Sequence, residues 1–313
     1  MPDNNFEADL RCYGPHASNI RVSVDEAHAY CRQLAASHYE NFSVVSWLLP
    51  PHLRQHFCNV YAYCRWADDL ADELGTPNER LALLDWWRRE LRDCFAGQTR
   101  HPVFVALQPT IEQFSIPEMP FLALLDAFER DQHQVRYATR EEIGDYCRYS
   151  ANPVGHLVLY LGRCHDAANA SLSDSVCTGL QLANFLQDVA EDFERGRIYL
   201  PREACVAFGY TEECFQQRIV DDRWRSLMKA EVDRASTYLH EGWPLVSQLP
   251  RDLRFQVDLF VRGGLAILQA IRDVDYDVWT ARPRIGKLTQ LKLATSSWLR
   301  QRVTGRRFAR NHG

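Results

Sequence analysis

Apolar residues recur along most of the chain with the spacing of one face of an α-helix. Ala27, Cys31 and Leu34 repeat at intervals of three and four residues, which is typical of a helix with a buried stripe. Ser23, followed three residues later by Glu26, is a capping box that predicts where this helix begins. The same period predicts further helices over 56–73, 79–95, 104–114, 119–130, 140–149, 155–161, 173–194, 202–207, 212–217, 224–240, 250–275 and 287–303.

The helical segments follow one another without a long linker. Gly and Pro residues separate them, and no stretch alternates apolar and polar residues as a strand does. The pattern predicts an all-α protein with one domain over 25–285. Residues 1–24 lack a clear period, so we expect a flexible N-terminal arm there, and we expect a basic helix or tail over 286–313.

The composition narrows the class of protein. Hydrophobic residues make up 46% and charged residues 25% of the 313 residues, a balance that excludes a disordered chain. The apolar runs are too short to cross a membrane, the first residues do not resemble a signal peptide, and the ten cysteines are scattered singly. These features predict a cytoplasmic protein.

The net charge of −5 is unevenly distributed. Residues 280–313 contain nine Lys or Arg and no Asp or Glu, so the rest of the chain is strongly acidic. An acidic body is not typical of a nucleic-acid-binding protein. The basic tail predicts either peripheral contact with an anionic membrane surface or a solvated charged end, and the sequence leaves both open.

Two acidic clusters lie on predicted helices. Asp68 and Asp72 are four residues apart, as are Asn184, Asp188 and Asp192 in turn, so each set shares one helix face. If the two faces oppose each other, several carboxylates crowd one cavity, and either a cation must balance them or some of them must be protonated. Oxygen ligands favour Mg²⁺, which readily shares phosphate oxygens. The clusters therefore predict a diphosphate substrate that metal ions bridge to the protein.

Arginines accompany both clusters. Arg65 lies one turn before the first cluster, and Arg195 and Arg197 follow the second. One guanidinium group can donate two parallel hydrogen bonds to phosphate oxygens, so these residues are candidates to hold diphosphate as it leaves. Surface ion pairing with the neighbouring carboxylates is the alternative.

The cluster sequences resemble those of the squalene/phytoene synthase family. The resemblance runs from about residue 30 to 284, and it rests on YAYCRWADDLAD at 61–72, QLANFLQDVAED at 181–192 and RGRIYLP at 195–201. It implies a single-domain isoprenoid-synthase helical bundle around a central cavity, with Mg²⁺ held by both acidic motifs. HYENF at 38–42, LLP at 48–50 and SANPVG at 150–155 are similar to the branch that forms hydroxysqualene in hopanoid biosynthesis.

Two departures from the condensing members of this family bear on the substrate. Those members read HSKSF where this chain has HYENF, so Glu40 stands where a lysine would help bind a diphosphate. A carboxylate there would repel a second diphosphate, which favours a substrate with a single diphosphate. Asn152 and Pro153 replace a small Ala-Gly pair, and we expect them to reshape the pocket.

The resemblance implies a reaction and its site. The reaction is Mg²⁺-dependent conversion of presqualene diphosphate and water to hydroxysqualene and diphosphate, without NADPH and downstream of a presqualene diphosphate synthase. The implied metal ligands are Asp68, Asp72, Asn184, Asp188 and Asp192. The implied catalytic residues are Asp68, Asp72, Asp188, Asp192 and Tyr199. The implied substrate-binding residues are His38, Tyr39, Asn41, Phe42, Arg65, Tyr146, Gln181, Asn184, Phe185, Arg195 and Arg197.

Several alternatives stay open at this point. Aromatic walls for a carbocation are expected from Phe42, Tyr146, Phe185 and Tyr199. Tyr39, Asn41, Gln181 and Tyr199 are candidates to position the water, and the sequence does not choose among them. Condensation of two farnesyl diphosphates to presqualene diphosphate and NADPH-dependent formation of squalene are the other reactions. A catalytically silent helical protein that binds lipid is the alternative of a different class.

Overall fold

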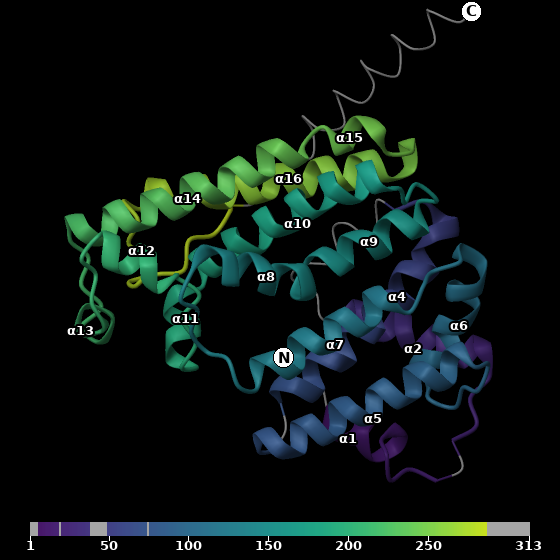
Figure 1. Ribbon diagram of the computed structural model, residues 1–313. Helices are drawn as coiled ribbons and strands as arrows, with labels where there is room; N and C mark the ends of the chain where they lie inside the picture. Colours follow the sequence, from purple (N-terminus) through teal and green to yellow (C-terminus); the bar gives the residue numbers. More distant parts are fainter. Residues whose placement is uncertain (1–5, 19, 38–48, 74, 287–313) are drawn as a thin grey trace, which may run out of the picture. The chain divides into compact units, whose positions relative to one another are not determined.

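The computed structural model describes residues 6–18, 20–37, 49–73 and 75–286 (Figure 1). Their secondary structure is helical, as the sequence predicts, apart from one isolated parallel bridge between Arg136 and Ile198. Backbone contacts divide the chain into two compact units. We call residues up to Gln134 together with His156–His165 unit 1, and Val135–Gly155 together with the chain from Asp166 onward unit 2. The capping box at Ser23 is confirmed, because the Ser23 amide donates to the Glu26 carboxylate at 2.8 Å.

Unit 1 contains the helices of the first half of the chain and the end of α9. They are α1 (Phe6–Tyr13), α2 (Val24–Ser37), α4 (Pro51–Asp72), α5 (Pro77–Phe95), α6 (Pro102–Phe114), α7 (Met119–Asp131) and the last residues of α9 (Asn152–Leu161). Helix α4 packs against α2, α5, α6 and α7, which makes it the centre of the unit. Its side chains are therefore buried on several faces, and Tyr63, Trp66 and Leu70 are fully inaccessible.

The described part of residues 1–24, where the sequence shows no clear period, contains a short helix. Residues Phe6–Tyr13 form helix α1, and the Phe6 side chain is buried with its ring edge-on to Trp66 at 4.9 Å. Asp9 accepts a hydrogen bond of 2.6 Å from the Tyr30 hydroxyl. One anchoring aromatic and one polar contact are enough to dock a two-turn helix whose own periodicity is too short to read in the sequence.

His101 lies at the centre of an aromatic cluster in unit 1. Its ring is edge-on to Trp66 at 4.4 Å and to Trp87 at 4.8 Å, and those two indoles stack on each other. The imidazole Nδ1 accepts a hydrogen bond from the Val103 amide at the start of α6. Burial lowers the pKa of His101 well below 6.5, with a smaller contribution from Arg100, so the folded protein holds a neutral ring.

We expect His101 to make the free energy of unfolding pH-dependent. Below about pH 6.5 the unfolded chain binds a proton that the folded chain does not, so stability falls by about 1.4 kcal/mol per pH unit until the folded pKa is reached. Urea denaturation at about pH 7.5 and about pH 5.5 measures this loss. His101→Asn keeps the cap acceptor and removes the titration. Parallel pH profiles for wild type and variant would contradict the assignment.

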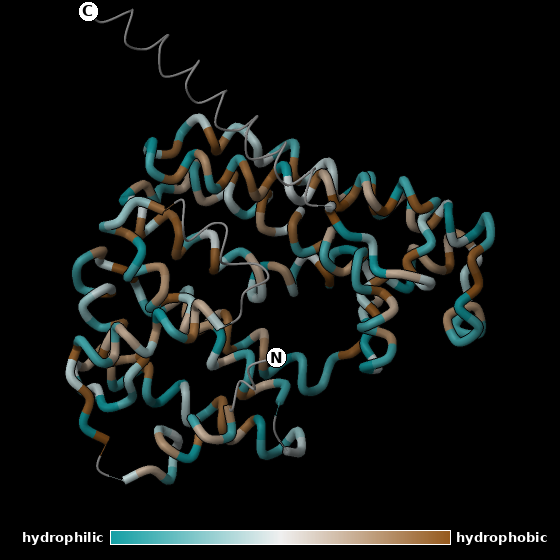
Figure 2. Tube along the Cα trace, turned by 180° about the vertical axis from the view of Figure 1, so that it is seen from behind, coloured by the Kyte–Doolittle hydropathy of each residue, from teal (hydrophilic) through white to brown (hydrophobic). Residues whose placement is uncertain are grey.

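Unit 2 contains the helices of the second half and the start of α9. They are α8 (Arg140–Ser150), α10 (Ala167–Gln187), α11 (Val189–Glu194), α12 (Arg202–Ala207), α13 (Glu212–Gln216), α14 (Asp222–Gly242), α15 (Leu245–Gln248) and α16 (Arg251–Asp273). Helices α10, α14 and α16 run alongside one another (Figure 1). Hydrophobic and hydrophilic residues are interspersed along the trace (Figure 2). In α16 the buried residues Leu253, Val257, Val261, Gly264 and Leu268 recur every three or four positions, which is the pattern of a helix that buries one face. None of the described helices combines the length and apolar composition that a membrane crossing requires.

Glycines allow α10 and α14 to pack closely. A Cβ at Gly242 would lie 2.7 Å from the carbonyl oxygen of Leu172 and 2.7 Å from the amide nitrogen of Val176, both backbone atoms that cannot turn aside. Gly179 on α10 meets Leu239 of α14 in the same way. Gly263 in α16 differs, because a Cβ there would meet nothing within 4 Å.

The two kinds of glycine predict opposite effects of alanine. Gly242→Ala is expected to lower the free energy of unfolding by about 2 to 3 kcal/mol, because the helices must separate. Gly263→Ala is expected to raise it by about 0.5 to 1 kcal/mol, because alanine favours a helix interior. Urea denaturation of both variants is the measurement. Equal effects of the two substitutions would show that the close approach does not limit packing.

Candidate active site

The first acidic motif lies on α4 of unit 1. Asp68 is half-buried and Asp72 is exposed, one turn apart as the sequence predicts. Arg65 pairs with the Asp68 carboxylate at 3.1 Å and with Glu73 at 3.1 Å. It also contacts Asp69, so in this structure Arg65 is paired with carboxylates of its own helix.

Asp69 is a residue of this motif to which the sequence analysis gave no role. Its side chain is 1% exposed, and burial raises its pKa to about 8, although Arg65 lowers it. Its helical position, one residue after Asp68, turns it toward the core. No local signal in the sequence separates it from Asp68, because its burial follows from the helices that surround α4.

The second acidic motif lies at the junction of α10 and α11 in unit 2. The sequence predicts one helix over 173–194, but α10 ends at Gln187 and α11 begins at Val189, with Asp188 between them at φ −104° and ψ 14°. The one-turn spacing of the three predicted ligands is kept across the break. The Asp188 amide donates to the Asn184 carbonyl at 2.9 Å, and the Asp192 amide donates to the Asp188 carbonyl at 2.8 Å.

The two carboxylates of this motif influence each other. Burial, together with the neighbouring Asp188, raises the pKa of Asp192 to about 7, and Arg197 and Arg195 oppose the shift. Asp188 is 13% exposed on its side chain, and Asn184 is exposed on α10. A cation beside Asp192 would favour the ionised form of its carboxylate.

The segment after α11 carries the basic and aromatic residues of the site. Gly196 reverses the chain at φ +77°, a conformation that favours glycine. The Ile198 amide then donates to the Val135 carbonyl at 2.9 Å, and the Arg136 guanidinium donates to the Leu200 carbonyl at 2.6 Å. These two anchors hold Tyr199 between them.

Three aromatic rings gather around Tyr199. Its ring stacks on Phe185 with centroids 3.8 Å apart and an interplanar angle of 6°, and it lies 5.8 Å from Tyr146. Tyr137 stacks on Tyr199 at 5.8 Å and is buried, although the sequence analysis did not single it out. Tyr146, Phe185 and Tyr199 are thus brought together from α8, α10 and the segment after α11. Gln181 is half-buried one turn before Phe185 on α10.

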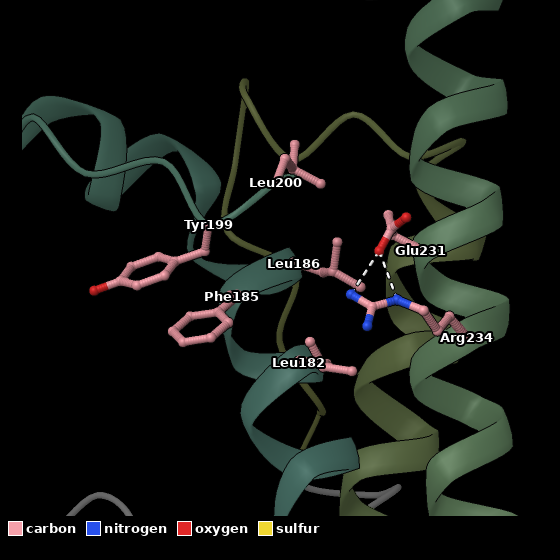
Figure 3. A pocket seen from close by; sticks show the side chains of 7 residues that line it. All are labelled: Leu182, Phe185, Leu186, Tyr199, Leu200, Glu231 and Arg234. Carbon is pink, nitrogen blue, oxygen red and sulfur yellow. Dashed lines mark hydrogen bonds and ion pairs between the residues drawn. The ribbon is translucent and has the colours of Figure 1, made fainter. Parts of the chain in front are cut away.

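Two small pockets flank this aromatic group. One is lined by Asp192, Arg197, Phe185 and Tyr199 together with apolar neighbours. The other is also lined by Phe185 and Tyr199, and it reaches Glu231 and Arg234 of α14 (Figure 3). Each has space for about one water molecule. Asp192 and Arg197 therefore face the same small space as two of the aromatic rings.

Buried Glu231 ties α8 to α14. Its side chain is 2% exposed, and its carboxylate pairs with Arg140 at 2.8 Å and with Arg234 at 2.8 Å. Arg140 is the first residue of α8, the helix that carries Tyr146. The ion pairs therefore fix the position from which Tyr146 reaches the aromatic group.

The donor chemistry of the acidic motifs fits Mg²⁺. They supply carboxylate and amide oxygens, and the raised pKa of Asp192 marks a place where a cation would be favourable. Among the described residues, no three His, Cys, Asp or Glu side chains already converge as a metal site. His38, Tyr39, Asn41 and Phe42 lie outside the described residues, as does the tail from 287 onward.

The all-helical fold and the two oxygen-rich motifs are those of an isoprenoid synthase. The family model for squalene/phytoene synthase matches residues 35–289, and the chain belongs to that family. It is 35% identical over 294 residues to a 15-cis-phytoene synthase from Synechocystis sp., covering 90% of this chain and 87% of that protein.

Solved structures agree on the fold. The crystal structure of squalene synthase HpnC from Alicyclobacillus acidocaldarius is 47% identical with a TM-score of 0.78, over 82% of this chain and 97% of that one. A dehydrosqualene synthase in complex with ligand is 24% identical with a TM-score of 0.82, over 90% of this chain and 98% of that one, a likeness of fold alone.

Proposed function

We propose that this enzyme converts presqualene diphosphate and water to hydroxysqualene and diphosphate. The ionisation chemistry rests on one arrangement within unit 2, where Asp192 and Arg197 line the same small pocket as Phe185 and Tyr199. When diphosphate leaves a hydrocarbon, the charged side chains can stabilise the metal-bound diphosphate and the aromatic faces can stabilise the carbocation. Glu40 favours this substrate over two separate prenyl diphosphates, because its carboxylate would repel a second diphosphate. The 47% identity to the structure of a squalene synthase supports a product of the squalene series.

In the proposed reaction the carbon–oxygen bond to the diphosphate breaks and its electron pair leaves with the diphosphate. Mg²⁺ held by Asn184, Asp188 and Asp192 would supply positive charge to that leaving group. Asp68 and Asp72 are the proposed ligands of Mg²⁺ at the first motif. Arg197 and Arg195 add guanidinium donors beside Asp192. The Arg65 guanidinium is assigned the same task next to Asp68.

The cyclopropylcarbinyl cation that remains rearranges next to the aromatic group. Tyr146, Phe185 and Tyr199 present ring faces, which stabilise a desolvated cation by about 2 kcal/mol or more. A water oxygen then forms the new carbon–oxygen bond and releases a proton. Gln181 and the Tyr199 hydroxyl are candidates among the described residues to orient that water.

Condensation of two prenyl diphosphates is the second candidate. It is favoured by the curated relatives, since two cyanobacterial phytoene synthases are 35% and 32% identical to this chain. That reaction requires a second diphosphate to bind where Glu40 now stands.

Product analysis by mass spectrometry separates the candidates. The purified full chain is supplied with Mg²⁺ and presqualene diphosphate, with and without NADPH, and separately with farnesyl or geranylgeranyl diphosphate. The proposal expects hydroxysqualene from presqualene diphosphate in both the presence and the absence of NADPH. Presqualene diphosphate made from farnesyl diphosphate, phytoene made from geranylgeranyl diphosphate, or squalene made only with NADPH would replace it with a condensing or reducing synthase.

A further inference from the structure

The segment that follows α16 folds back onto the second acidic motif. Trp279 is buried, 5.4 Å from Trp224 and 5.5 Å from Phe193, and it fixes the start of this segment. Three residues later, Arg282 reaches Asp188, although the two residues are 94 positions apart in the chain. Both belong to unit 2.

Arg282 covers both oxygens of the Asp188 carboxylate. Its Nε donates to Oδ1, and a terminal guanidinium nitrogen donates to Oδ2 at 3.0 Å. The same guanidinium lies 3.8 Å from the Glu191 carboxylate. The Gln187 side-chain amide adds a hydrogen bond of 2.5 Å to the Pro283 carbonyl, so the backbone beside Arg282 is held as well.

A guanidinium group that contacts both carboxylate oxygens competes with a metal ion for the same atoms. Each uses the oxygen lone pairs of Asp188, and each is a cation, so both cannot occupy the carboxylate without strong repulsion. The Asp188 side chain is 13% exposed and lies one helical turn from Asp192, so a positively charged partner is favourable there. In this structure Arg282 is that partner.

We propose that Arg282 is the counter-ion of Asp188 in the metal-free enzyme and that it must leave this carboxylate when Mg²⁺ binds. Metal loading and release of the 281–286 segment from the acidic motif are then one coupled equilibrium. Because such coupling is reciprocal, Arg282 weakens metal binding by the same factor by which metal weakens the Arg282–Asp188 contact. The inference rests on the metal site of the proposed function, but not on the identity of the product.

Metal binding in the absence of prenyl substrate tests the competition. The full chain is titrated with Mn²⁺ as a probe for the Mg²⁺ site, with and without inorganic diphosphate, and free Mn²⁺ is followed by electron paramagnetic resonance. Arg282→Gln is expected to bind Mn²⁺ about tenfold more tightly than wild type, because no charged hydrogen bonds must first be broken. Arg284→Gln is the matched control, an exposed arginine two residues away, and its affinity should equal that of wild type. Equal or weaker binding by Arg282→Gln would overturn the proposal.

Tryptic cleavage after Arg284 gives a second readout that needs no metal affinity. Mn²⁺ should accelerate this cut in wild type, because the segment is released. In Arg282→Gln the cut should be fast without metal and unaffected by it, even if the substitution loosens the segment locally. Protection of wild type by Mn²⁺, or an unchanged rate, would contradict displacement. If the product assay instead yields presqualene diphosphate, the proposed function fails while both of these expectations stand.

Discussion

Replacing Asp188 with asparagine is expected to lower turnover by about a thousandfold or more, with the fold retained. Asparagine keeps the shape of the side chain at the junction of α10 and α11 but removes the negative charge that would hold Mg²⁺. The lost interaction acts on the leaving diphosphate, so the fall should appear in kcat more than in KM. Steady-state kinetics at saturating Mg²⁺, with circular dichroism as a check of the fold, make the measurement.

Glu191→Gln is the matched control for this variant. Glu191 lies in α11, three residues after Asp188. It is also near Arg282, but its side chain is 55% exposed. It should retain turnover within about threefold of wild type, since screened surface charges contribute little. Full activity of Asp188→Asn, or an equal loss in both variants, would remove Asp188 from the metal site.

Replacing Glu231 with glutamine is expected to cost about 3 kcal/mol of stability. The carboxylate is 2% exposed and pairs with two arginines, so its removal leaves the Arg234 guanidinium, 20% exposed, without its buried partner. Arg140 is 41% exposed and can turn to water, which limits its share of the loss. Urea denaturation measures the change.

The same substitution should alter catalysis through α8. Freed from Glu231, Arg140 no longer fixes the start of the helix that carries Tyr146, so the ring contact with Phe185 and Tyr199 should loosen. We expect a lower kcat and a broader set of products, with KM little changed. Glu203→Gln is the control, because Glu203 also contacts Arg140 but through the backbone amide. Unchanged stability of Glu231→Gln would show that these ion pairs are replaceable.

Local signals in the sequence located most helices. The capping box at Ser23 and Glu26 is present in the structure, and the predicted helix over 202–207 has the bounds of α12. The start of α10 was missed by six residues, although Asp166 caps it by accepting a hydrogen bond from the Asn169 amide. The four-residue helix α15 was also missed, because it spans about one turn and has no period to detect.

The site was predictable where spacing along one helix decides it. Asp68 and Asp72 on α4, and the ladder of Asn184, Asp188 and Asp192, follow from i,i+4 spacing, which the break at Asp188 leaves intact. The break itself has no signal, because neither Gly nor Pro marks it.

Contacts between distant segments could not be read from the sequence. Arg282 on Asp188 and Tyr137 on Tyr199 depend on how the chain returns after α16 and before α8. The burial of Asp69 likewise follows from the helices that surround α4. The period of apolar residues describes one face of one helix, whereas these contacts are set by packing among several helices and segments.

The central claim is that the carbon–oxygen bond to diphosphate ionises and that water captures the resulting cation. The most direct test is turnover of presqualene diphosphate in water enriched in heavy oxygen, followed by mass spectrometry of the alcohol. The account predicts hydroxysqualene whose hydroxyl carries the heavy isotope, with diphosphate that does not. An unrearranged alcohol with unlabelled oxygen would mean that a phosphorus–oxygen bond breaks instead, and it would contradict the account.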